Sequence, residues 1–355
     1  MAAPLAPSSS PSISRELSFD ALGRTPVGRD PASEPLLVVA VSTEEEFDWL
    51  EQARFERPST SVRAARNLER AQLLFDRLGV RPLYLVDHPV ATQDESAAPL
   101  REFLRSGRCE IGAHLHPWVS PPHEEERTSV HSFPCNLPSD LEGRKLRVLV
   151  EAIESAFEVR PLAYQAGRYG FAPASVPGLL REGFEIDFSL SPPFDFRPEG
   201  GPDWSRVDSE PFWLGAERRL LVVPVTGAYV GFAGRRSHAL HEWARSMPEW
   251  GRMPGVLARL GAVERIRLSP EGFSLPDMQR LTRSLLRRGQ RVFVLSFHSP
   301  SLLPGCTPYV RTERDLEALL ERCRGFIEFF LGELGGRSVT SLELRRCLAE
   351  RGTPA

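Results

Sequence analysis

EIGAHLHPW, residues 110–118, is the stretch from which the fold of this chain follows. Its short apolar run ends in two histidines and a proline, which predicts a buried β-strand over residues 109–116. Six other short apolar runs share this pattern and are also predicted to be strands: 35–42, 81–87, 160–167, 185–191, 220–227 and 291–299.

Longer stretches with helical periodicity separate these runs, at 61–79, 141–158, 174–184, 276–289 and 312–334. Strands that are apolar on both faces and alternate with helices predict an α/β fold with parallel strands. Seven strands suit a distorted (β/α) barrel as well as an open sheet. No G-x-G-x-x-G or G-x-x-x-x-G-K-[ST] motif follows any of the strands, which excludes dinucleotide-binding and P-loop folds.

The composition indicates one domain and excludes several classes of function. The 355 residues carry a net charge of -3, so a general binder of nucleic acid or of anionic membranes is not expected. Residues 1–33 are rich in Pro, Ser and Ala and are predicted to be a disordered tail, followed by a single barrel domain over 34–352. Neither a signal peptide nor a run of about 20 apolar residues is found, which favours a cytoplasmic protein without a membrane span.

Polar residues follow several of the predicted strands, at the end where parallel β/α folds place their active sites. His114 and His116 are two residues apart on one strand, so their side chains point the same way and could bind a divalent ion such as Zn²⁺. Glu44, the first carboxylate after the first strand, is the expected third ligand, with Glu45 and Asp48 as alternatives. A solvated turn or helix start is the expected setting of Glu46.

Two further candidates lie after later strands. His298 ends the last strand, where a functional histidine at the rim and a hydrogen-bonded core histidine are both possible. Arg168 follows the fourth strand directly, next to Tyr169, and could hold a carboxylate bidentately or form a structural salt bridge.

Five segments in this order resemble the polysaccharide deacetylase family, in its WalW-like branch: VSTEEEFDW, YLVDHPV, EIGAHLHPWVSPP, YQAGRYGF and LSFHSPSLLPGCTPYV. The resemblance covers most of residues 35–310. It implies a distorted (β/α) barrel of about seven strands and a metal-dependent hydrolase that removes N- or O-acetyl groups from sugars.

The resemblance also implies roles for particular residues. His114, His116 and Glu44 would bind the metal ion, His298 would be the general acid, and Arg168 would orient the base. The catalytic Asp of the family corresponds to Ser42, so either Glu44 or Glu45 would replace that base, with Glu45 as the first choice, or the activity would be weak, altered or lost. The second metal histidine of the family lies four residues after the first, where this chain has Trp118, and the family's arginine aligns with Gln165.

Three functions follow as hypotheses. The first is a zinc-dependent deacetylase of an acetylated glycan in bacterial surface-polysaccharide metabolism. The second is a non-catalytic relative that binds a glycan or a partner protein, because Ser42 replaces the acid. The third is a metal-dependent amidohydrolase of a non-sugar amide. Trp118 and Tyr169 are the candidate substrate-binding side chains, with local packing as the alternative, and the sequence does not predict the oligomeric state.

Overall fold

All seven predicted strands are present in the computed structural model, which describes residues 18–28, 30, 32–47, 55, 58–231 and 264–350. They are parallel to one another and neighbour each other in the order β8-β6-β5-β4-β3-β2-β11. Their bounds are β2 (Leu36–Thr43), β3 (Leu83–Val86), β4 (Glu110–Leu115), β5 (Ala163–Ala166), β6 (Ile186–Asp187), β8 (Leu220–Val222) and β11 (Val292–His298).

The sheet curves into a barrel whose two ends meet through irregular segments. Thr226 accepts a hydrogen bond from Val294 N at 2.8 Å, and Leu268 O accepts one from Ser296 N at 3.1 Å. These bonds join the segments that flank β9 (Gly227–Val230) and β10 (Glu264–Arg267), a two-stranded antiparallel sheet, to β11. The distorted barrel predicted from the resemblance is therefore confirmed.

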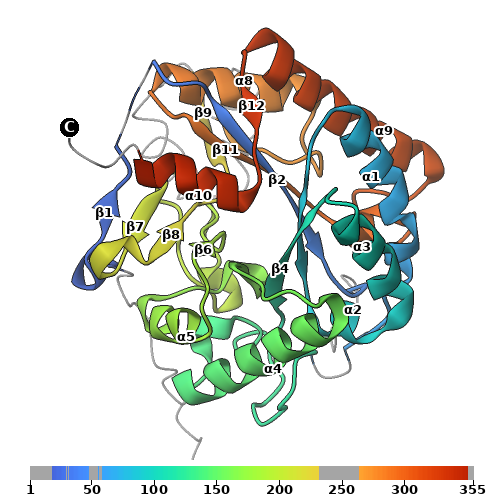
Figure 1. Ribbon diagram of the computed structural model, residues 1–355, viewed down its shortest axis with the longest axis vertical. Coiled ribbons are helices and arrows are strands. Elements are labelled where there is room, and N and C mark those ends of the chain that lie inside the picture. Colours follow the sequence, from blue (N-terminus) through green and yellow to red (C-terminus); the bar gives the residue numbers. More distant parts are fainter. Residues whose placement is uncertain are drawn as a thin grey trace, which may run out of the picture.

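Helices surround the strands (Figure 1). Five occupy predicted ranges: α1 (Leu68–Arg77), α4 (Ser139–Phe157), α5 (Val176–Arg181), α8 (Leu275–Arg287) and α9 (Glu313–Glu328). Three were not predicted: α2 (His88–Thr92), α3 (Asp94–Arg105) and α10 (Ser341–Glu350). Helix α3 buries one face through Ala97, Leu100 and Phe103, but it contains Pro99, which argues against a helix, and α2 is only five residues long.

Helix α10 covers the amino ends of the strands. Ser341 N donates to Glu110 at 2.6 Å, and Arg345 pairs with Glu185 at 3.0 Å; both acids stand at the start of strands. In Figure 1 this helix lies across the front of the barrel. The opposite end of the barrel, where the strands finish, is left for a functional site.

The disordered tail predicted for residues 1–33 is wrong for its described C-terminal part. Phe19 is 4% exposed and stacks on Phe171 with the ring centroids 5.6 Å apart, and β1 (Thr25–Pro26) pairs with β7 (Phe212–Leu214). A single buried phenylalanine in a Pro- and Ser-rich stretch gives no periodic signal, which is why the prediction missed it. Residues 1–17 lie outside the described part of the chain.

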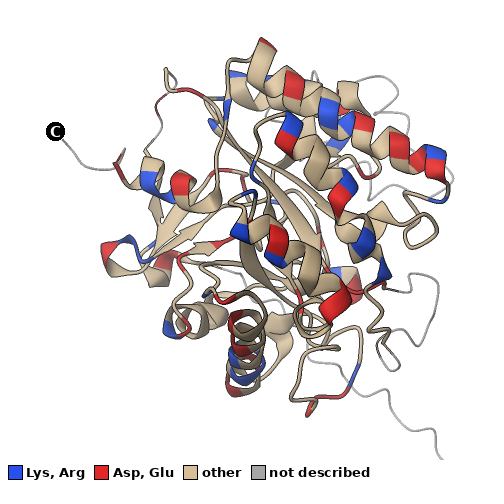
Figure 2. Ribbon diagram, turned by 45° about the vertical axis from the view of Figure 1, so that its right-hand side comes forward, with Lys and Arg blue, Asp and Glu red and all other residues tan. Residues whose placement is uncertain are grey.

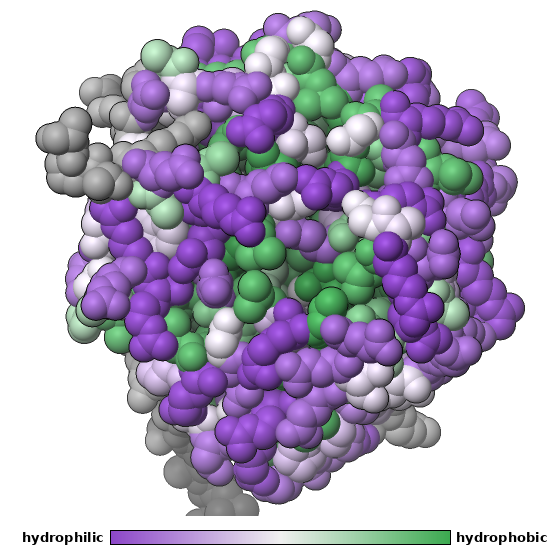
Figure 3. All heavy atoms as spheres, in the orientation of Figure 1, coloured by the Kyte–Doolittle hydropathy of each residue, from purple (hydrophilic) through white to green (hydrophobic). Residues whose placement is uncertain are grey.

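Charge lies mainly on the helices and outer loops, while the strands carry little of it (Figure 2). On the face of Figure 1, hydrophilic side chains form most of the outline and apolar atoms show between them near the centre (Figure 3). Among the described residues, no helix is long and apolar enough to cross a membrane.

Candidate metal centre

Glu44, His114 and His116 meet at the carboxyl ends of β2 and β4. Glu44 Oε2 lies 3.2 Å from His114 Nε2 and 3.6 Å from His116 Nε2. All three side chains are buried, and one ligand atom from each lies within 4.8 Å of the other two. The structure thus brings together the three residues that the sequence predicts as metal ligands.

The other ring nitrogen of each histidine has an acceptor. His114 Nδ1 lies 3.0 Å from the carbonyl oxygen of Gln165, and His116 Nδ1 lies 2.9 Å from Glu45 Oε2. Because a carbonyl oxygen only accepts, His114 carries its proton on Nδ1, and the same tautomer suits His116 beside a carboxylate. Metal-binding histidines show this backing by a carbonyl or a carboxylate.

The charge state of these groups favours a cation. Burial lowers the pKa of both His114 and His116, so the rings are neutral and their Nε2 lone pairs face Glu44. Burial alone would raise the pKa of Glu44, but the charge of His298 and the contact with His114 lower it to about 2. Two lone pairs and a carboxylate repel one another unless a cation lies between them, and two imidazoles with one carboxylate are a common donor set for Zn²⁺.

Glu45 is not placed to act as the general base, and this prediction is corrected. The residue is fully buried, and both carboxylate oxygens are occupied: Trp118 Nε1 donates to Oε1 at 2.7 Å and His116 Nδ1 lies 2.9 Å from Oε2. Burial also raises the pKa of Glu45 to about 7. Its contacts instead fix the orientation of His116.

Asp87 completes this buried cluster from the end of β3. It accepts from Glu45 N at 2.9 Å and, as the N-cap of α2, from Val90 N at 2.9 Å. Its Oδ2 lies 3.9 Å from His116 Nδ1, so Glu45, Asp87 and His116 form a second group of potential ligands. Burial raises the pKa of Asp87 well above its usual value.

Trp118 is not an exposed platform for a sugar, contrary to the prediction. It is 3% exposed and stacks on His116, with the ring centroids 4.2 Å apart. Its other ring neighbours are Phe47 and Phe55. The indole therefore supports the metal-site histidine from behind and donates to Glu45.

Arg168 and Tyr169 follow β5 in left-handed backbone conformations, with φ of 53° and 58°. Gly167 makes this turn possible, because a Cβ there would lie 2.5 Å from Leu115 O and 2.7 Å from His116 Cδ2. Tyr169 is 9% exposed, and its hydroxyl accepts from Arg267 Nη1 at 3.3 Å. The tyrosine thus lies beside the site, on the wall of its mouth.

Arg168 lies in the turn after β5, and its predicted role of orienting the base stays a prediction. Its guanidinium pairs with Glu199, donates to Ser132 Oγ at 2.6 Å and lies 4.2 Å from the ring centroid of Phe133. These contacts tie the loop after β4 to the loop after β6.

Ser42 and Gln165 touch each other across the barrel interior. They lie on β2 and β5, two strands that β3 and β4 separate, and Ser42 Oγ donates to Gln165 Oε1 at 2.8 Å. Gln165 Nε2 donates in turn to Phe188 O at 3.3 Å. The two positions at which the sequence departs from the family's acid and arginine are therefore in direct contact, as a neutral pair.

His298 ends β11 beside this pair, in register with Ser42. Its Nδ1 lies 2.7 Å from Glu271 Oε2, and its side chain is 26% exposed. Burial alone would lower the pKa of His298, but the charges of Glu271 and Glu44 raise it to about 10. The histidine is therefore a protonated acid at neutral pH, and the expectation of a functional rim histidine fits its position.

Sequence reasoning missed Glu271 and Asp87 as members of the site. Glu271 lies in the loop between β10 and α8 and does not directly follow a predicted strand, so the sequence pattern gives no sign that it reaches the site. Asp87 ends a predicted strand, which was a usable signal. The alternative ligand Asp48 lies outside the described residues.

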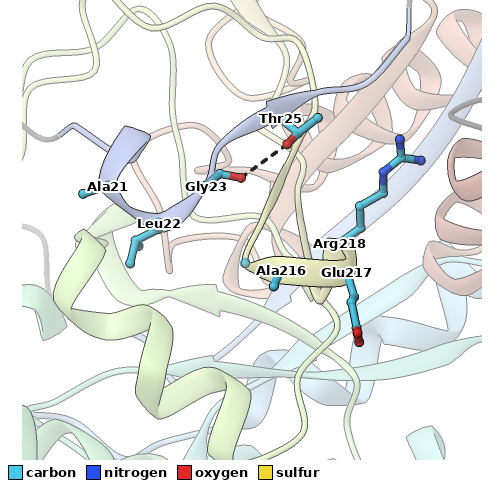
Figure 4. A pocket seen from close by; sticks show the side chains of 8 residues that line it. Ala21, Leu22, Gly23, Thr25, Ala216, Glu217 and Arg218 are labelled. Atoms are coloured by element: carbon cyan, nitrogen blue, oxygen red, sulfur yellow. Dashed lines mark hydrogen bonds between the residues drawn. The ribbon is translucent and has the colours of Figure 1, made fainter.

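A depression between Leu22 and Arg218 lies at the amino end of the barrel, where the turn between β7 and β8 meets residues 21–25 (Figure 4). Figure 4 shows Glu217 and Arg218 pointing away from each other there, and one hydrogen bond from Thr25 to Gly23. No group of titratable side chains converges among its lining residues.

No protein-family model and no curated protein sequence matches this chain. Solved structures do resemble it. A protein of Mycobacterium smegmatis provisionally classed as a polysaccharide deacetylase is similar with a TM-score of 0.56 at 17% identity, over 93% of this chain and 96% of that one. The 4-alpha-glucanotransferase of Thermococcus litoralis is similar with a TM-score of 0.50 at 11% identity, over 88% of this chain and 40% of that one. This chain therefore has the fold of the polysaccharide deacetylases.

Proposed function

We propose that this protein is a metal-dependent hydrolase that removes an acetyl group from an acetylated glycan or sugar. One observation carries the proposal. Glu44 converges on one point with two neutral histidines, and the Nδ1 of each histidine lies next to an acceptor oxygen. Protonated His298, which contacts Glu271, lies beside them. Metal ligands next to a general acid are the groups that acyl hydrolysis needs.

Glu44, His114 and His116 would hold the ion, for which we propose zinc. A divalent ion at this place would lower the pKa of a bound water and polarise the acetyl carbonyl. His298 would donate its proton to the leaving nitrogen or oxygen, and Glu271 holds the ring in the orientation that leaves Nε2 for this transfer. Glu45 and the carbonyl of Gln165 keep both metal histidines in the required tautomer.

The base is the weak element of this site. Ser42 occupies the position of the family's acid, and its hydroxyl cannot accept a proton near neutral pH without an activating partner. Gln165, which it contacts, is neutral. We therefore expect slow turnover, since a general base is worth roughly 10²- to 10⁴-fold. The finer expectation of a bacterial surface polysaccharide as substrate rests on the resemblance in sequence, and that of a cytoplasmic location rests on the sequence pattern alone.

The test is to measure bound metal and acetate release together. Protein purified without chelator is analysed for zinc, and acetate is then assayed with acetylated chito-oligosaccharides and with acetylated xylan after addition of Zn²⁺ or Co²⁺. His114→Ala should remove both metal and activity. His131→Ala serves as the matched control, because His131 Nδ1 contacts only a loop carbonyl in the exposed part of the chain. The proposal would be overturned if the purified protein held no stoichiometric ion and released no more acetate than His114→Ala.

The contact between Ser42 and Gln165 favours a second candidate, a glycan-binding protein that has lost catalysis. A neutral pair has replaced an acid and an arginine together, and the pair satisfies its own hydrogen bonds. The discriminating experiment compares Ser42→Asp, Gln165→Arg and the double variant. Acetate release that only the double variant gains, from a zero background, supports this candidate, whereas substantial turnover by the unchanged protein excludes it.

A further inference from the structure

Arg267 places a positive charge at the rim of the barrel mouth without a carboxylate partner. It ends β10 and donates from Nη1 to the Tyr169 hydroxyl at 3.3 Å and from Nη2 to Ser191 Oγ at 2.5 Å. No carboxylate lies within 4.0 Å of its guanidinium among the residues that the structure describes, and its buried Nε has no hydrogen-bond partner there. Its hydrogen bonds go to neutral groups, so its charge is uncompensated.

Aromatic rings hold this guanidinium in place. Its Cζ lies 4.9 Å from the ring centroid of Tyr169 and 4.2 Å from that of Phe194. Arg265 Cζ lies 4.2 Å from the centroid of the same Phe194 ring. Contacts of a cation with rings stabilise its position but do not neutralise it. A guanidinium that is held in place and partly exposed in this way can bind an anion.

The rim beside Arg267 also offers an exposed ring. Tyr309 is 42% exposed, one of three exposed large hydrophobic residues in the described part of the chain. A Cβ at Gly272, next to Glu271, would lie 3.5 Å from the Tyr309 ring, so this tyrosine stands beside the pair of Glu271 and His298. Burial and the charge of Glu271 raise the pKa of Tyr309, and the charge of Arg267 opposes this shift.

We propose that Arg267 binds the carboxylate of an acidic sugar residue while Tyr309 stacks on a sugar ring, so that the substrate is a uronate-containing acetylated glycan. The inference rests on the proposed function for the identity of the site but not on its turnover. Arginine recognises carboxylates through paired, charge-assisted hydrogen bonds. A neutral glycan would leave the charge of Arg267 unpaired at the mouth.

Binding rather than activity tests this inference. Hyaluronan tetrasaccharide, in which N-acetylglucosamine alternates with glucuronate, is compared with chitotetraose, which is neutral, by calorimetric titration of the full chain. We expect hyaluronan to bind at least tenfold more tightly at low salt, with the difference shrinking as salt is raised. Arg267→Gln should abolish the difference, and Tyr309→Ala should weaken both ligands. Arg324→Gln is the matched control, because Arg324 pairs with Glu321 and Glu328 on the outer face of α9.

His114→Ala separates this inference from the proposed function. If glucuronate bound through a metal ion, the preference for hyaluronan would vanish in that variant, and the role of Arg267 would be refuted. Equal binding of the two tetrasaccharides, or a preference that survives in Arg267→Gln, would refute it as well. Failure of the proposed function would instead be seen in the metal analysis and the acetate assay, as an absence of bound metal or of acetate release.

Discussion

Replacing Glu45 by Gln tests the metal site through a residue that would not touch the ion. In the folded protein the Glu45 carboxylate accepts from Trp118 Nε1 at 2.7 Å and lies 2.9 Å from His116 Nδ1. A glutamine can still accept from the indole with its carbonyl oxygen. Its amide group then faces His116 Nδ1 as a donor, which would move the histidine's proton to Nε2. That is the nitrogen turned toward Glu44.

The size of the effect follows from this switch. The substitution removes one charge-assisted hydrogen bond in a fully buried setting and favours the tautomer that cannot bind metal. Loss of such backing typically lowers metal affinity roughly 10- to 100-fold, which is about 1.4 to 2.8 kcal/mol at 1.4 kcal/mol per decade. The volume of the side chain hardly changes, so we expect the fold to be retained.

The assay is a zinc titration in competition with a chromophoric chelator at neutral pH, with circular dichroism to check the fold. Glu46→Gln is the matched control: it is the neighbouring buried acid, but it accepts from Ala64 N at 2.7 Å and pairs with Arg63, away from both histidines. Zinc affinity unchanged in Glu45→Gln, or reduced equally in Glu46→Gln, would refute the reasoning.

Three further predictions concern other residues. Burial raises the pKa of Glu142 from 4.5 in the unfolded chain to about 7 in the folded protein. The free energy of unfolding therefore falls as the pH rises from 4.5 to 7, because the folded protein must then give up a proton that it binds more tightly than the unfolded chain does. Glu142→Gln should raise the free energy of unfolding by about 3 kcal/mol at pH 8 but little at pH 4, as measured by thermal melts. Equal gains at both pH values would contradict this. Lys145, the sole lysine, is fully buried and pairs with Glu125 at 2.9 Å, so Lys145→Met should cost about 3 to 5 kcal/mol in chemical unfolding, and adding Glu125→Gln should recover part of it. His298→Gln should lower acetate release by roughly 10²- to 10⁴-fold with zinc affinity within twofold of the unchanged protein, and parallel losses of both would exclude an acid role.

The strands and the convergence of the three candidate metal ligands could be predicted because their signals are local. Each strand lies within a short apolar run, and every residue of β2 is buried, so no alternating pattern was needed to find it. Two histidines two residues apart on a strand must share a face. With parallel strands, Glu44 was then the nearest acid that could reach them, and the structure brings all three together.

The rest of the site depends on contacts between distant segments. The burial of Glu45 comes from Trp118, which lies 73 positions away, and the partner of His298 is Glu271, from a loop 27 positions earlier. A sequence shows that Glu45 is acidic, but not that both of its oxygens are already occupied. Trp118 was misjudged for the same reason, since an aromatic residue after a strand can face solvent or, as here, pack behind the histidine.

Anomalous diffraction from crystals soaked in Zn²⁺ tests the central claim most directly. The account predicts one peak at the zinc edge, about 2.0 to 2.2 Å from His114 Nε2, His116 Nε2 and a carboxylate oxygen of Glu44. The absence of any peak at these residues would contradict it. A peak at His116 Nδ1, between Glu45 and Asp87, would contradict it equally.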